Sequence, residues 1–151
     1  MRAEQAHAEA LAQRVLEAEE AFRRGERALE RDQIAAALRE LERAVELNPD
    51  EVEHHAALAW AQFCAAPDKQ VVATGTRQAL EHAIRTSPGI VTARFYLGRV
   101  ERMLGNDRDA LRHFREVLEL EPRHPGATAE VRVLEQRLGA DKGGVFARLK
   151  R

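Results

Sequence analysis

The chain has 151 residues and a formal net charge of −1 at pH 7, with 44% hydrophobic, 32% charged and 5% aromatic residues. This length allows one domain with a continuous core, and the near-zero charge gives no general attraction to nucleic acid or an anionic membrane. No apolar run reaches the roughly 20 residues that span a bilayer, and the single Cys64 excludes an internal disulfide. We therefore expect a cytoplasmic protein with no nucleic-acid partner and no membrane span.

Ala, Leu, Glu and Arg dominate the sequence and β-branched residues are sparse, which predicts an all-α fold. Along the first helix, Leu11, Val15, Ala18 and Phe22 form an apolar stripe at heptad-like spacing. Residues 1–17 are therefore expected to be an N-terminal extension of this helix. Two interpretations stay open for the extension: it frays or leans on its own chain, or it forms a dimer contact.

Helix-ending prolines divide the next part of the chain into units. Pro49, Pro88 and Pro122 are 39 and 34 residues apart, so the middle unit is five residues longer than the last. The extra residues are expected at 65–69, as a lengthened turn that Pro67 breaks. In the first unit, Asp32 is expected to cap the second helix in place of a glycine turn.

The clearest unit runs from Ile90 to Pro122 and contains two helical patterns joined by Gly105-Asn106-Asp107. Apolar residues recur at helical spacing on both sides of this turn. The stretch resembles a tetratricopeptide repeat, a family with a period of about 34 residues, although Arg94 stands where the family usually has an aromatic residue. The residues that carry the resemblance are Leu97, Gly98, Gly105, Ala110, Phe114 and Pro122.

The resemblance implies a right-handed superhelix of antiparallel helix pairs, with about seven helices. The expected domain covers 18–138, with repeats at 18–49, 52–88 and 91–122 and a capping helix at 125–138. Four charged residues of the first repeat occupy slots that would pack on a preceding repeat, so nothing is expected to pack there. They are Glu20, Arg24, Arg27 and Arg31.

The tail, residues 139–151, begins with a glycine-containing segment that predicts a flexible break, and ends in a basic, amphipathic peptide. It is interpreted either as a disordered terminus or as a docking peptide whose anchors are Phe146, Arg148 and Leu149.

Side chains with catalytic or metal-binding spacing are not found. The six histidines form no i, i+4 pair, and none is near Cys64 in the sequence. The carboxylates alternate with arginines on helix surfaces. We expect no catalytic residue, no metal and no cofactor, and hence no enzyme.

The first helix of each repeat lines the concave side in this family, and partners bind there as a peptide or a helix. This surface would hold the only Trp and the only Tyr of the chain, residue types that are common at interfaces. The expected groove residues are Phe22, Glu26, Leu29, Trp60, Phe63, Phe95, Tyr96, Arg99, Arg102 and Met103.

Some members of the family grip the terminal carboxylate of an acidic chaperone tail with Lys, Asn and Arg. None of the five matching positions here has a suitable residue: they hold Phe22, Glu26, Ala57, Thr92 and Tyr96. A clamp for an Hsp70- or Hsp90-type tail is therefore not expected, and a partner segment with aromatic anchors and mixed charge is favoured.

Together these features predict a non-catalytic adaptor or scaffold that binds a peptide or helix of a partner protein in the groove. The alternative is a self-associating structural or regulatory module, with a second copy of the chain as its partner in a homodimer. The third repeat, cap and basic tail also look like the C-terminal segments of larger bacterial signalling or J-domain-linked co-chaperone proteins.

Overall fold

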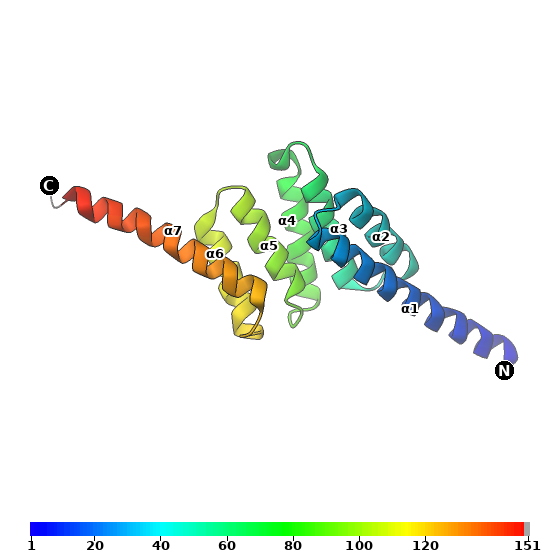
Figure 1. Cartoon of the computed structure of the whole chain (residues 1–151). Helices are drawn as coiled ribbons and strands as arrows, with labels where there is room; N and C mark the ends of the chain where they lie inside the picture. Colours follow the sequence, from blue (N-terminus) through cyan, green and yellow to red (C-terminus); the bar gives the residue numbers. More distant parts are fainter. Residues whose placement is uncertain (150–151) are drawn as a thin grey trace.

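The computed structural model describes the backbone of residues 1–149 and the side chains of residues 1–139 (Figure 1). Within residues 1–149 there are seven helices and no strand, as the all-α prediction required. In the same residues, no helix combines the length and apolar character needed to cross a bilayer. The helices are α1 (Arg2–Glu30), α2 (Ile34–Leu47), α3 (Val52–Ala65), α4 (Lys69–Thr86), α5 (Thr92–Met103), α6 (Asp107–Leu120) and α7 (Pro125–Leu149).

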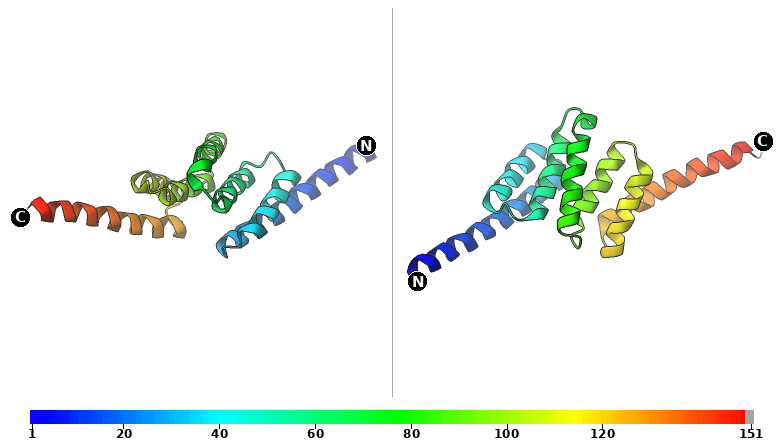
Figure 2. Two further views of the ribbon diagram at one scale, coloured as in Figure 1. Left: turned by 90° about the horizontal axis from the view of Figure 1, so that it is seen from above. Right: turned by 180° about the vertical axis from the view of Figure 1, so that it is seen from behind.

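Successive helices pack as pairs, α1 with α2, α3 with α4, and α5 with α6, and the pairs stack in chain order. The first helices of the pairs also contact each other in order, α1 with α3 and α3 with α5, and we call these three the inner helices. Figure 2 shows that the start of α1 and the end of α7 project from opposite ends of this stack. The fold is therefore a solenoid, in which each pair buries its apolar face against its neighbours.

Two glycines allow the helices of a pair to approach closely. A Cβ atom at Gly25 would lie 2.6 Å from Leu41 Cγ, and one at Gly98 would lie 2.7 Å from Phe114 Cε1. Both Leu41 and Phe114 are fully buried. The glycines thus mark equivalent positions in the first and third pairs, where a large side chain of the outer helix contacts the backbone of the inner one.

The buried side chains form two clusters. The larger one runs through α1 to α5, and the smaller one joins α6 to α7 through residues that include Phe114 and Leu134. Phe95 of α5 packs against both clusters. Salt bridges add links between helices: Arg77 of α4 contacts buried Glu101 of α5 at 2.6 Å, and Arg102 of α5 pairs with Glu130 of α7.

The added length of the middle repeat lies in a helix, and the expected long turn at 65–69 is wrong. Three residues connect α3 to α4, the same number as in the other two pairs, while α4 has 18 residues against 14 in α2 and α6. The Asp68 carboxylate accepts a hydrogen bond from Gln70 N at 3.1 Å. Lys69 Nζ donates to the carbonyl oxygen of Cys64 at 3.1 Å. The first bond caps the start of α4, and the second satisfies a carbonyl at the end of α3. The helix α4 can therefore start directly after the break at Pro67.

Asp32 does not cap α2, in contrast to the prediction. Gln33 is the N-cap residue, and Asp32 has a φ of 58°, in the left-handed region. Gly105 has a φ of 85° at the equivalent turn of the third pair. Asp is one of the few side chains that adopt this conformation at modest cost, so Asp32 replaces the turn glycine through its backbone conformation.

The charged face at the start of the stack is exposed at Glu20, Arg24, Arg27 and Arg31, as expected if no repeat precedes α1. Residues 1–16 of the same helix are exposed as well. They continue α1 as one helix that overhangs α2 (Figure 2).

At the other end, the expected helix end at Leu138 and the break after it are wrong, because α7 continues to Leu149. The glycines at 139, 143 and 144 each cost the helix about 1 kcal/mol, but extending an existing helix requires no new nucleation. The predicted docking anchors Phe146, Arg148 and Leu149 lie outside the residues whose side chains are described, as do residues 150–151 altogether. Their role stays a prediction.

The close contact at Gly98 can be tested by a single methyl group. We expect Gly98→Ala to destabilise the protein by about 1–3 kcal/mol, because the new Cβ would force the Phe114 ring from its position in a packed core. Gly75→Ala in α4 is the matched control. No atom lies within 4 Å of a Cβ at Gly75, so this variant should gain about 0.5–1 kcal/mol from helix propensity. Urea unfolding of both variants measures the difference, and equal midpoints would contradict the packing described.

Candidate functional site

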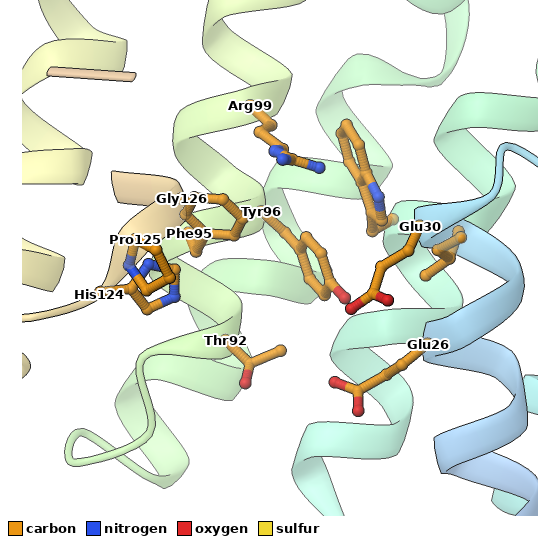
Figure 3. Close-up of a pocket in the computed structure, with 11 residues that line it drawn as sticks. Glu26, Glu30, Thr92, Phe95, Tyr96, Arg99, His124, Pro125 and Gly126 are labelled. Atoms are coloured by element: carbon orange, nitrogen blue, oxygen red, sulfur yellow. The ribbon is translucent and has the colours of Figure 1, made fainter. Parts of the chain in front are cut away.

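A cleft opens where the inner helices meet the start of α7, and its volume is about 490 Å³. This size is typical of binding pockets. Figure 3 shows side chains from α1, α5 and the start of α7 around the same space. Because the inner helices belong to three different pairs, an occupant would contact all three at once. The lining residues are Glu26, Leu29, Glu30, Trp60, Thr92, Phe95, Tyr96, Arg99, His124, Pro125 and Gly126.

Aromatic rings form the base of the cleft. Trp60 of α3 and Tyr96 of α5 stack with 5.4 Å between ring centroids and 6° between planes, and they keep only 6% and 8% of their surface exposed. Phe95 lies beside Tyr96 and 4.7 Å from the His124 ring. The rings are held by the core on one side and line the cleft on the other, so they form a rigid surface for an occupant.

Charged side chains of opposite sign stand on opposite sides of these rings. Glu26 and Glu30 project from α1, and Figure 3 shows their carboxylates pointing toward the hydroxyl end of Tyr96. Arg99 of α5 lies over two aromatic rings, with its guanidinium carbon 4.6 Å from the Phe95 centroid and 6.0 Å from the Trp60 centroid. Both contacts have cation–π geometry. The cleft therefore has an acidic side and a basic side across an aromatic base.

Burial raises the pKa of Glu26 above its ordinary value. The neighbouring carboxylates of Glu53, Glu30 and Glu19 raise it further, while Arg23 lowers it. An ionised Glu26 is thus disfavoured because it loses solvent and faces other negative charges. Arg23 therefore offsets only part of the negative charge on the acidic side of the cleft.

Two further polar groups adjoin that side. Thr92 Oγ1 donates a hydrogen bond to Glu53 Oε1 at 2.6 Å, which connects the starts of α5 and α3. Burial, followed by the negative charge of Glu26, raises the pKa of Tyr96. The Tyr96 phenol therefore stays protonated at neutral pH and presents a hydroxyl beside the carboxylates.

Six of the ten residues predicted for the groove lie together in the cleft, namely Glu26, Leu29, Trp60, Phe95, Tyr96 and Arg99. Phe22 and Phe63 do not line it. Phe22 is 4% exposed and stacks on His54 with 4.6 Å between centroids, and Phe63 is fully buried. Both rings belong to the core, because they face the neighbouring helix of the stack.

Arg102 and Met103 occupy the last turn of α5, beyond the residues that line the cleft. Arg102 pairs with Glu130 of α7, so it holds the last helix to the third pair. The Met103 side chain is half exposed. Helical spacing alone does not reveal where a groove ends, and these two positions lie one turn past it.

The groove prediction missed the residues that close the cleft at the start of α7. His124 Nδ1 accepts a hydrogen bond from Ala127 N at 3.0 Å, which caps the helix. A Cβ at Gly126 would lie 2.7 Å from Phe95 Cζ, so the missing side chain lets α7 approach the aromatic base. The signal in the sequence was the position of His124-Pro125-Gly126 at the start of α7, the helix that follows the third pair.

Neither a metal site nor a reactive cysteine is evident in the described part of the chain. No group of three His, Cys, Asp or Glu side chains there could hold a metal ion. Burial raises the pKa of Cys64 to about 11, which leaves little of the nucleophilic thiolate near pH 7. The cleft offers aromatic, acidic and basic contacts, which are suited to binding.

Comparisons with known proteins agree with this architecture. The family model "Tetratricopeptide repeat" matches residues 91–124. No curated protein matches the sequence.

Three similar solved structures are all TPR domains. The Arabidopsis OM64 TPR domain has 21% identity and a TM-score of 0.60, covering 82% of this chain and 98% of its own. The first TPR of Spaghetti (RPAP3), bound to the HSP90 peptide SRMEEVD, has 19% identity and a TM-score of 0.59, covering 83% and 95%. The second TPR domain of human RPAP3, in complex with the HSP70 peptide SGPTIEEVD, has 18% identity and a TM-score of 0.55, covering 83% and 98%.

The raised pKa of Glu26 makes a prediction about stability and pH. When a carboxyl has a higher pKa in the folded state than in the unfolded state, the protein loses stability as the pH rises from the unfolded-state pKa through the folded-state pKa. We therefore expect Glu26→Gln to be more stable than the wild type at pH 7, with a gain that shrinks toward pH 4.5, the ordinary pKa of Glu. Thermal unfolding at a series of pH values measures this.

Glu20→Gln is the matched control for this experiment, since Glu20 is exposed on the same helix and does not line the cleft. It should change stability by less than about 0.5 kcal/mol. A Glu26→Gln variant that is less stable than the wild type at pH 7 would show that the carboxylate has a favourable partner, against the electrostatics described here.

Proposed function

We propose that this chain, a tetratricopeptide-repeat protein, is a non-catalytic adaptor that binds a peptide or a single helix of a partner protein in the cleft between its inner helices. One observation carries the proposal. The only Trp and the only Tyr of an aromatic-poor chain stack on each other at the base of that cleft. Trp, Tyr and Arg are the side chains that most often dominate interface energetics.

The shape and charge of the cleft support a peptide-sized occupant. A volume of about 490 Å³ accommodates a few side chains, and the carboxylates and the guanidinium of Arg99 on its two sides offer polar contacts that would fix an orientation. The aromatic base is already packed in the free protein, so little ordering of the binding surface would be needed. Pre-formed sites of this kind favour recognition of a defined segment.

Two of the similar structures contain a chaperone peptide, which supports peptide binding by this architecture. A shared fold does not by itself carry function across at this level of identity, so the proposal rests on the cleft. We also propose a cytoplasmic location, because Cys64 is free and a reducing compartment suits an unpaired thiol.

Removal of the charged groups on both sides of the cleft tests this proposal. We expect the double variant Glu30→Ala/Arg99→Ala to lose capture of partner proteins by tenfold or more, since two contacts of 1 kcal/mol or more would be removed. Affinity capture with quantitative mass spectrometry compares it with the wild type. Circular dichroism checks that the helices remain folded.

The matched control is Glu42→Ala/Arg43→Ala, which removes one Glu and one Arg from exposed positions on the outer helix α2. It should capture the same proteins as the wild type. If the cleft variant kept its full set of captured proteins while the α2 variant lost it, binding would occur on the convex side and the proposal would fail.

Self-association is a second candidate function, favoured by the overhanging part of α1. Leu11, Val15 and Leu16 are 50%, 49% and 60% exposed there. An apolar stripe at heptad-like spacing on an isolated helix is suited to pairing with a second copy. In this alternative the chain is a structural or regulatory module, either as a homodimer or within a larger bacterial signalling or co-chaperone protein.

Solution mass distinguishes this alternative. If α1 mediates pairing, the wild type should be a dimer at micromolar concentration, and Leu11→Glu/Val15→Glu should be a monomer, because four buried charges would face one another in the dimer. Both positions are exposed, so the folded monomer should keep its stability. Multi-angle light scattering measures the mass, and a monomeric wild type would remove the idea.

A further inference from the structure

The acidic side of the cleft lacks its own positive partners. Among the described residues, the side chains of Glu26 and Glu30 form no hydrogen bond and no salt bridge. Carboxylates elsewhere in the molecule commonly pair with arginines. Glu53, next to them, accepts a hydrogen bond from the neutral hydroxyl of Thr92. Glu26 and Glu30 thus line one side of the cleft, with Glu53 beyond its lining, and neither forms a salt bridge with a described residue.

The nearest arginines are engaged elsewhere. Arg23 pairs with Glu19 at 3.2 Å on the exposed surface of α1, and Arg99 lies over Phe95 and Trp60 on the other side of the base. Arg99 therefore does not neutralise the acidic side, and it forms no salt bridge among the residues described. The remaining titratable lining residue is His124, whose Nδ1 is used to cap α7.

The hydroxyl end of Tyr96 adjoins the space between the two carboxylates (Figure 3). Figure 3 shows the Tyr96 ring between Glu30 and Glu26 on one side and Phe95 on the other. The oxygen of a tyrosine hydroxyl accepts hydrogen bonds, so it can serve as one acceptor for a Lys or Arg side chain. The two carboxylates would add charge-assisted hydrogen bonds to the same cation.

We propose that the cleft selects a basic partner segment, with a Lys or Arg side chain seated between Glu26 and Glu30 beside the hydroxyl of Tyr96. This inference rests on the proposed peptide-binding function and specifies the class of partner. The apolar part of the segment contacts Phe95 and Leu29. The raised pKa of Glu26 supports the proposal, because a bound cation would relieve the repulsion among the carboxylates.

The same charges exclude an acidic tail. The peptides SRMEEVD and SGPTIEEVD in the similar structures end in Glu, Val and Asp. Seated on the acidic side, their carboxylates would face Glu26 and Glu30, and like charges brought together in this way cost several kcal/mol. Arg99, on the basic side, would be the one arginine among the described lining residues to pair with their several carboxylates. The cleft of this chain is thus opposite in charge preference to a site for such a tail.

Selection from an unbiased peptide library tests the proposal. The full chain is immobilised, and a phage-displayed library of random dodecapeptides is selected on it at low salt. We expect enriched sequences to contain Lys or Arg next to an aromatic or aliphatic residue. A synthetic copy of the most enriched sequence is then titrated by calorimetry, with SRMEEVD as the acidic comparison.

Charge-neutral variants of the acidic side complete the test. We expect Glu26→Gln/Glu30→Gln to bind the selected peptide tenfold or more weakly than the wild type, with a smaller dependence of affinity on salt. Glu9→Gln/Glu20→Gln makes the same change at two exposed positions of α1 outside the cleft and should bind like the wild type. SRMEEVD should not bind the wild type.

The outcomes separate the two levels of the account. If no peptide is enriched, the proposed peptide-binding function itself is contradicted. If peptides are enriched but are acidic or lack Lys and Arg, or if the Gln variant binds them as tightly as the wild type, the function stands and the basic selectivity is overturned.

Discussion

The stacking of Trp60 on Tyr96 is the contact on which both the fold and the cleft depend. It joins the inner helices of the second and third pairs with nearly parallel rings, 5.4 Å between centroids. One side of the stack continues into the large core cluster, and the other side forms the base of the cleft. Stability and recognition therefore share the same rings, so a change that removes either ring would affect both. Charged residues at the rim can be altered separately, because they contribute little to the core.

The arrangement of charge around this base follows from which helix supplies each residue. The first inner helix, α1, carries exposed charged residues on its outer face. It also carries the carboxylates Glu26 and Glu30 on the side that lines the cleft. The third pair supplies Arg99, which is held over aromatic rings. Burial and repulsion from neighbouring carboxylates disfavour the ionised form of Glu26. A binding site with this pattern gains most from an occupant that brings positive charge to one end and apolar surface to the other.

Much of this architecture could be predicted from the sequence, because helical periodicity, ending prolines and small residues recur in register. Local compensations could not be predicted. Lys69 and Asp68 convert an expected loop into an additional turn of α4, and Asp32 adopts a glycine-like backbone conformation. Spacing also could not separate Phe22 and Phe63, which are buried in the core, from Phe95, which lines the cleft, since all three lie on inner helices. Arg94, in place of the usual aromatic residue, donates to the Pro88 carbonyl oxygen at 2.6 Å and so satisfies a polar group at a loop.

The central claim is that a partner segment occupies the cleft above Trp60 and Tyr96. The most direct measurement is a ¹H–¹⁵N correlation spectrum of the labelled protein during titration with a peptide selected from the library. The single indole N–H of Trp60 gives an isolated signal for the base of the cleft. The account predicts that this signal and the backbone amides of Glu26, Glu30, Phe95 and Arg99 shift together and saturate with one affinity. Shifts confined to the outer helices α2, α4 and α6, with the Trp60 signal unchanged, would contradict it.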